Sequence, residues 1–85
     1  MNELLINVYC PSISKSYDFW IPGGLKASSV LQQVCDEICE IENNKNIFDN
    51  RGSLLLCSYM QQNVLQSDLT LDNAGIRSGD RLAIV

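Results

Sequence analysis

The sequence predicts a small α+β domain in which a single helix packs across one face of a β-sheet. Apolar and polar residues alternate in segments near both ends of the chain, the pattern of half-buried strands. Between these segments, apolar residues recur every three or four positions, which is the spacing of one helical face. The 85 residues, 46% of them hydrophobic, suffice for one thin core, so we expect residues 1–85 to form a single domain.

Two strands are predicted near the N-terminus and form an antiparallel hairpin. The first spans residues 3–10, and the second runs from Tyr17 to Ile21 after a turn. Alternation places these side chains on one face of the hairpin: Leu4, Ile6, Val8, Cys10, Tyr17, Phe19 and Ile21. The sequence Pro22-Gly23-Gly24 ends the second strand.

An amphipathic helix is predicted over residues 29–42. Its apolar stripe consists of Val30, Leu31, Val34, Cys35, Ile38 and Ile41. Ser28 or Ser29 is expected to cap the first turn, and Gln32 follows Ser29 at the spacing of a capping box. We therefore expect the helix to begin at these hydroxyl groups.

The second half of this helix carries an acidic run without a neighbouring base: Asp36, Glu37, Glu40 and Glu42. Because the helix dipole favours cations at this end, the run breaks a local rule without visible compensation. We interpret it as a solvated face. The alternative is an acidic docking face for a basic juxtamembrane segment.

The remaining elements are shorter. A polar connection over residues 43–52, interrupted by Ile47 and Phe48, returns the chain to the sheet. The apolar run 54–59 is a predicted strand of ambiguous inward and outward parity, and residues 64–65 form a brief segment after a turn. Asp72 is expected to cap a short helical turn, and the last strand is predicted over residues 81–85.

The elements follow one another as hairpin, helix, strand, short strand and final strand, which is the ββαββ order of the β-grasp fold. We expect a mixed sheet of four to five strands with the helix packed across it. Leu82 and Ile84 alternate in the last strand as Leu4 and Ile6 do in the first. These two strands are therefore the expected central pair.

Residues 69–85 resemble the end of ubiquitin-like folds, where a leucine, a short turn, an isoleucine and a final strand follow one another. Within them, the sequence Gly75-Ile76-Arg77-Ser78-Gly79-Asp80-Arg81-Leu82 is similar to the YukD/EsaB-like family, the small ubiquitin-like proteins of Gram-positive type VII (WXG100) secretion systems. Elsewhere the resemblance extends to length, element order and apolar pattern. It implies a cytoplasmic accessory protein of a membrane export machine that acts by noncovalent binding.

The charged residues of this motif also have a structural explanation. Gly79 and Asp80 are typical turn residues, and the predicted last strand follows them directly. We therefore interpret Arg77, Asp80 and Arg81 as residues that determine the fold.

Composition argues against several classes of function. Six lysines and arginines against ten acidic residues give a net charge of −4, which opposes binding to nucleic acid or anionic lipid. The small chain has no histidine, so we expect no enzymatic activity and no cofactor. No apolar run approaches the roughly 20 residues that span a bilayer, and Met1 precedes Asn2 and Glu3 rather than a basic segment. We expect a cytoplasmic protein that reaches the membrane only through a protein partner.

The four cysteines raise a different hypothesis. Cys35 and Cys39 lie four residues apart on the predicted helix, where two thiolates could meet a metal ion or an oxidant, with Cys10 and Cys57 as companions. However, a Cys-x-x-Cys pair is missing and the surrounding segments are largely apolar. We expect reduced, structural cysteines and no metal site, and a redox or metal switch stays an alternative.

A further alternative is a sulfur carrier or a conjugated modifier of the same fold. Both need a flexible tail that ends in Gly-Gly. Here the sequence ends at Val85, inside the predicted last strand, and the Gly23-Gly24 pair is internal. We therefore expect noncovalent binding rather than transfer through the C-terminus.

Trp20 marks the predicted partner-binding surface. Its strand parity is opposite to that of the helix-facing residues, so it faces outward with Leu5 and Tyr9 of the neighbouring strand. Exposed aromatic clusters mark protein interfaces, and Tyr59 could extend this one. The alternative is that Trp20 folds over the loop after the helix, or that the register is shifted by one. The expected partner is a membrane component of the secretion apparatus, and a homodimer is also possible.

Overall fold

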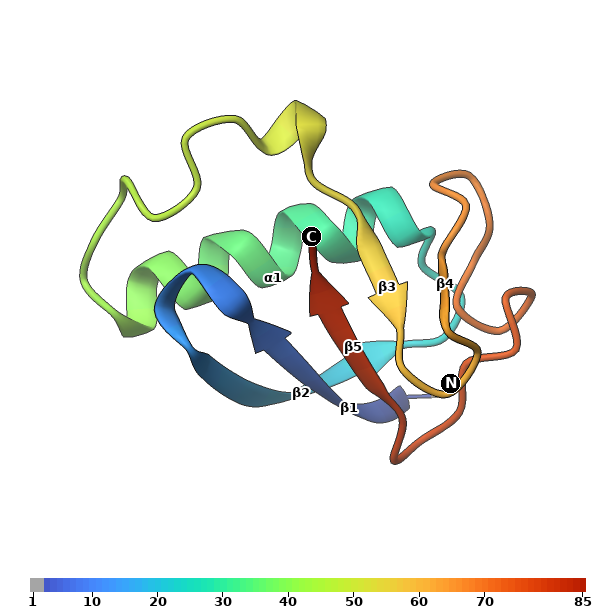
Figure 1. Ribbon diagram of the computed structural model, residues 1–85. Coiled ribbons are helices and arrows are strands. Elements are labelled where there is room, and N and C mark those ends of the chain that lie inside the picture. Colours follow the sequence, from blue (N-terminus) through green and yellow to red (C-terminus); the bar gives the residue numbers. More distant parts are fainter. Residues whose placement is uncertain (1–2) are drawn as a thin grey trace.

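One α-helix lies across one face of a five-stranded sheet in the computed structural model, which describes residues 3–85 (Figure 1). The strand order is β2-β1-β5-β3-β4. This arrangement confirms the predicted β-grasp fold. Met1 and Asn2, on which part of the expectation about an N-terminal signal depended, lie outside the described residues.

The N-terminal hairpin contains both predicted strands, and the second is longer than predicted at each end. β1 (Glu3–Cys10) pairs antiparallel with β2 (Lys15–Pro22), and Ile6 lies opposite Phe19. Alternate residues of both strands are buried under the helix. The connection is a short 3₁₀ turn, Pro11–Ile13, followed by Ser14 in the left-handed conformation at φ 54°.

The centre of the sheet is the parallel pair of β1 and β5 (Arg81–Ile84), as predicted from the alternation of the two end strands. Val8 lies opposite Leu82, and both side chains are fully buried. Figure 1 shows β5 between β1 and β3, with the helix behind all three. Full burial of one such aliphatic side chain stabilises the fold by about 1.5–3 kcal/mol.

The helix α1 (Ala27–Ile41) begins earlier than predicted, and the predicted serine caps are wrong. Its N-cap is Lys26, which makes no side-chain capping bond. The first free N–H groups are instead satisfied by distant backbone carbonyls: Ala27 donates to Leu69 at 2.8 Å and Ser28 donates to Ser67 at 3.1 Å. Because these carbonyls replace a side-chain cap, the helix start needs no hydroxyl group.

The buried stripe of α1 largely matches the prediction. It consists of Ala27, Val30, Leu31, Val34, Cys35, Ile38 and Cys39. Ile41, which the periodicity placed on this stripe, is 59% exposed at the last helical position, so that assignment is wrong. The buried stripe therefore ends at Cys39, two residues before the helix does.

The second half of the sheet is less regular than predicted. β3 (Leu56–Ser58) is shorter than the run 54–59, because a 3₁₀ turn at Arg51–Ser53 and an extended link precede it. β3 pairs antiparallel with β5 and with β4 (Asn63–Val64). Leu56 and Ser58 are buried, which resolves the ambiguous parity of this strand.

One of the two turns before β5 is capped by another residue than expected. Thr70, not Asp72, caps the short helical turn, because the Thr70 Oγ1 accepts a hydrogen bond from the Asn73 N–H at 3.1 Å. In the next turn the Asp80 carboxylate accepts a bond from the Arg77 N–H at 2.9 Å, in agreement with the structural role assigned to Asp80. Gly79 has φ 95° and donates its N–H to the Leu5 carbonyl at 2.8 Å.

We expect Gly79→Ala to destabilise the protein by about 1–2 kcal/mol, because an L-residue is strained at this φ. Gly24→Ala is the matched control, since its backbone lies outside the left-handed region and its new Cβ would meet no heavy atom within 4 Å. Chemical denaturation of both variants measures the difference. Equal stabilities would contradict the assigned strain.

Candidate protein-binding surface

The face of the sheet opposite α1 carries the four residues predicted to bind a partner. Leu5 and Trp20 are directly paired across β1 and β2, with 36% and 63% of their surfaces exposed. Tyr9 lies further along β1, and Tyr59 directly follows β3, with its N–H bonded to the Arg81 carbonyl at 3.0 Å. We call these residues, together with Arg81, the outer face. Trp20 therefore faces outward beside Leu5, as predicted. The two alternatives, that Trp20 folds over the loop after the helix or that the register is shifted by one residue, are wrong.

The outer face contains two groups of side chains. Leu5 and Trp20 form an apolar pair beside the turn that leads into β5, where the Leu5 N–H donates to the Ser78 Oγ at 2.8 Å. Tyr9 and Tyr59 form the second group, joined through Arg81. The Arg81 Cζ lies 5.8 Å from the Tyr9 ring centroid and 5.4 Å from that of Tyr59.

Arg81 has a position that the sequence analysis missed. Its place in the family-like motif favoured a purely structural role, but its side chain is exposed on the outer face. The Arg81 Nε donates to the Asn7 Oδ1 at 2.8 Å, and the Asn7 Nδ2 donates to the Asp18 Oδ1 at 2.9 Å. The missed signal is its parity, which is opposite to that of Leu82 in the last strand.

An apolar hollow of about 390 Å³ continues this surface beside Tyr59. Its lining includes Pro11, Cys57, Ala83 and Val85. Cys57 and Ala83 are paired across β3 and β5, so the hollow lies on the same side of the sheet as the two tyrosines. The outer face therefore has a cation and two aromatic rings at its centre. Apolar surface lies on both sides of them, at the Leu5 and Trp20 pair and at the hollow beside Tyr59.

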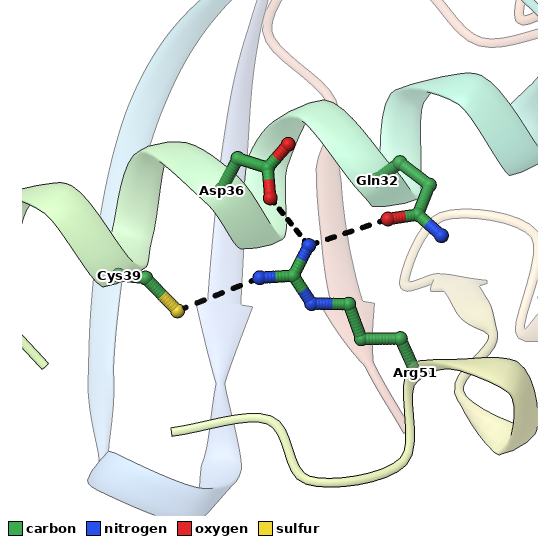
Figure 2. A network of polar contacts seen from close by, with 4 residues as sticks. All are labelled: Gln32, Asp36, Cys39 and Arg51. Carbon is green, nitrogen blue, oxygen red and sulfur yellow. Dashed lines mark hydrogen bonds and ion pairs between the residues drawn. The ribbon is translucent and has the colours of Figure 1, made fainter. Parts of the chain in front are cut away.

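The acidic run of α1 is partly compensated by other segments, so the interpretation that it lacks compensation is wrong. Figure 2 shows Arg51, from the 3₁₀ turn before β3, reaching the helix. Its Nη1 forms an ion pair with Asp36 and donates to the Gln32 Oε1 at 3.3 Å, and its Nη2 approaches the Cys39 Sγ at 3.7 Å. The ion pair with Asp36 raises the pKa of Arg51. These contacts hold the long connection against the helix.

Glu42 at the end of the same helix is also engaged. The Lys15 Nζ lies 2.9 Å from the Glu42 Oε1, and the Tyr17 hydroxyl donates to Oε2. The hydrogen bonds from Tyr17 and Lys15 lower the pKa of Glu42, while burial and the bond to Glu42 raise the pKa of Tyr17 to about 12. Both contacts are internal, which weakens the alternative of an acidic docking face.

The four cysteines are free thiols. Cys10, Cys35 and Cys39 are buried, and Cys57 is half-buried on the outer-face side of β3. Burial raises the pKa of Cys35 to about 11. Within residues 3–85, no group of three or more Cys, Asp or Glu side chains is arranged to hold a metal ion. No helix in the same range has the length and apolar character needed to cross a bilayer.

No protein-family model and no curated protein matches this sequence. Among solved structures, the chain is similar to the ubiquitin-like domain of EccD5 from Mycobacterium xenopi, with a TM-score of 0.79 at 12% identity over 100% of this chain and 94% of that one. It is also similar to the ubiquitin-like domain of the Mycobacterium tuberculosis type VII secretion system protein EccD1, with a TM-score of 0.74 at 17% identity over 100% and 99%.

The likeness extends to ubiquitin itself. A ubiquitin from Caldiarchaeum subterraneum has a TM-score of 0.71 at 13% identity over 98% of this chain and 91% of that one. At such identities the likeness shows the fold and not the role. The chain therefore has the ubiquitin-like form of the β-grasp fold.

We expect Glu42→Gln to flatten the loss of stability on acidification. Because the pKa of Glu42 is lowered on folding, its contribution is present above its unfolded value of 4.5 and is lost as the pH falls through the folded value. Thermal unfolding between about pH 7 and pH 3 measures this slope. Glu40→Gln, at an exposed helical position, is the control, and equal slopes for the two variants would contradict the Glu42 cluster.

We expect one thiol of the native protein to react quickly with a disulfide reagent and three to react only on unfolding, since only Cys57 is partly exposed. Cys57→Ser should remove the fast reaction, and Cys39→Ser should leave it unchanged. Rapid modification of Cys35 or Cys39 would contradict this picture and revive the thiol-switch hypothesis.

Proposed function

We propose that this chain is a non-enzymatic adaptor that binds a membrane component of a type VII secretion apparatus noncovalently through its outer face. The observation that carries the proposal is the exposed aromatic surface around Trp20 on the face that α1 leaves uncovered, where Trp20 itself is 63% exposed. Exposed tryptophan, tyrosine and arginine are the residue types that most often dominate binding energy at interfaces.

Two further observations support the secretion context. One of the similar folds belongs to EccD1, which is described as a type VII secretion system protein. Independently, residues 69–85 resemble the YukD/EsaB-like family of such systems. In this role the chain resides in the cytoplasm and reaches the membrane through its partner.

The chemistry of the outer face fits binding better than catalysis. Besides the two tyrosine hydroxyls, its polar group is the Arg81 guanidinium, which ends a hydrogen-bonded row with the neighbouring residues Asn7 and Asp18. The whole sequence lacks histidine, and the neighbouring hollow is mostly apolar. The Asp18 carboxylate is already engaged by Asn7, and the surface offers shape and charge to a partner rather than an enclosed site for a reaction.

Affinity capture from detergent-solubilised membranes of the source cell tests this function. We expect membrane proteins of the secretion apparatus to co-elute with the tagged wild-type protein and to be lost with Trp20→Ala, because the largest exposed aromatic anchor is removed. Ile41→Ala is the matched control, since Ile41 is similarly exposed at 59% but lies at the end of α1.

The outcomes separate role from surface. Recovery with wild type and Ile41→Ala alone supports both the role and the outer face. Equal recovery with Trp20→Ala overturns the assigned face. Recovery of no secretion protein with any variant overturns the role, and elution of an untagged copy of this chain alone indicates a homodimer instead.

A further inference from the structure

Arg81 is the centre of the outer face and has unused hydrogen-bonding capacity. Its Nε is bonded to Asn7, which leaves the opposite edge of the guanidinium, formed by Nη1 and Nη2. Among residues 3–85, neither terminal nitrogen has a hydrogen-bond acceptor and no carboxylate forms an ion pair with Arg81. This edge matches the two oxygens of a carboxylate.

Arg51 provides the comparison within the same chain. Its terminal nitrogens contact Asp36, Gln32 and Cys39, so its charge is used internally to hold a loop to α1. Arg81 makes no equivalent contact with the rest of the described chain beyond its single bond to Asn7 and the two tyrosine rings. An arginine held in place but left unpaired is free to serve a partner.

The Arg81 side chain is held in advance of binding. The Asn7 amide group donates to Asp18, so its oxygen is turned toward the Arg81 Nε. Tyr9 and Tyr59 flank the guanidinium at 5.8 and 5.4 Å, distances at which ring and cation attract each other. Since little side-chain freedom remains to be lost, a contact with this group gives more affinity than one with a mobile lysine.

We infer that Arg81 is a recognition site for an aspartate or glutamate side chain of a protein partner, held by two parallel hydrogen bonds to Nη1 and Nη2. The acidic residue lies between apolar neighbours in the partner, which contact the Leu5 and Trp20 pair on one side and the hollow beside Tyr59 on the other. The inference rests on the proposed function because both use the outer face. It adds the chemistry that selects the partner.

The overall charge strengthens the specificity of this site. The chain carries a net charge of −4, so acidic partners are repelled at long range. A carboxylate is therefore favoured only where the local geometry accepts it, at the guanidinium edge. A free nucleotide or nucleic acid is repelled by the same net charge. The outer face, as defined above, offers it no cation besides Arg81.

Selection from a displayed library of random peptides against the intact wild-type protein tests the site directly. We expect enrichment of peptides with an aspartate or glutamate between apolar residues. Replacing that acid by its amide in the strongest peptide should weaken binding about tenfold or more, as expected for loss of a charge-assisted pair. Selection that yields no acidic preference, or no binding peptide, overturns the inference.

Variants of the protein assign the preference to Arg81. Arg81→Gln should weaken binding of the acidic peptide by a similar factor, so that the acidic and the amide peptide bind with equal affinity. Arg81→Lys, which keeps the charge but not the planar guanidinium edge, should also weaken binding of the acidic peptide. Lys45→Gln removes an equal charge from the exposed connection after α1 and should change nothing. Equal losses in Arg81→Gln and Lys45→Gln would indicate a long-range charge effect and overturn the site.

Failure of this inference and failure of the proposed function are distinguishable. Peptides that require both the acid and Arg81 support the site even if no secretion protein is captured from membranes. Conversely, capture that depends on Trp20 but not on Arg81, together with peptides that show no acidic preference, overturns the carboxylate site and leaves the adaptor role intact.

Discussion

The structure depends on the parallel pairing of β1 with β5 at the centre of the sheet. This pairing buries Val8 against Leu82 under α1. Its two outer edges pair with the neighbouring strands, β1 with β2 and β5 with β3. It also determines what lies on the uncovered face, because Asn7 is placed opposite Arg81. The same strand pairing therefore determines both the core and the candidate site. A change of register by one residue would bury Arg81 and expose Leu82.

A second set of long-range contacts joins the two halves of the chain around the start of α1. The carbonyls of Leu69 and Ser67 accept bonds from Ala27 and Ser28, and Lys26 forms a bridge with Thr70. At the other end of the helix, Glu42 is held by Lys15 and Tyr17. Both ends of α1 are thus bound to the rest of the domain by polar contacts, while its middle is held by apolar packing.

The parts of the fold that local patterns determine were predictable from the sequence. Alternation over residues 3–10 identified β1 and its buried face, and alternation over residues 17–21 placed Trp20 outward. The start of α1 was not predictable, because its capping carbonyls come from residues 67 and 69, far along the chain. The contacts of Arg81 with Tyr9 and Tyr59 were not predictable, because they require that β1 and β3 flank β5 in the sheet.

The pairing of β1 with β5 has a consequence for synthesis on the ribosome. Asn7 emerges early, but its partner Arg81 is 74 residues away in sequence. Until β5 has left the exit tunnel, β1 lacks its central neighbour, and the apolar faces of β1 and α1 have no complete sheet to cover them. A chain with such non-local contacts folds late and slowly relative to its length. Neighbouring nascent chains on one messenger RNA therefore expose apolar surface that is prone to aggregation until β5 has been synthesised and has left the tunnel.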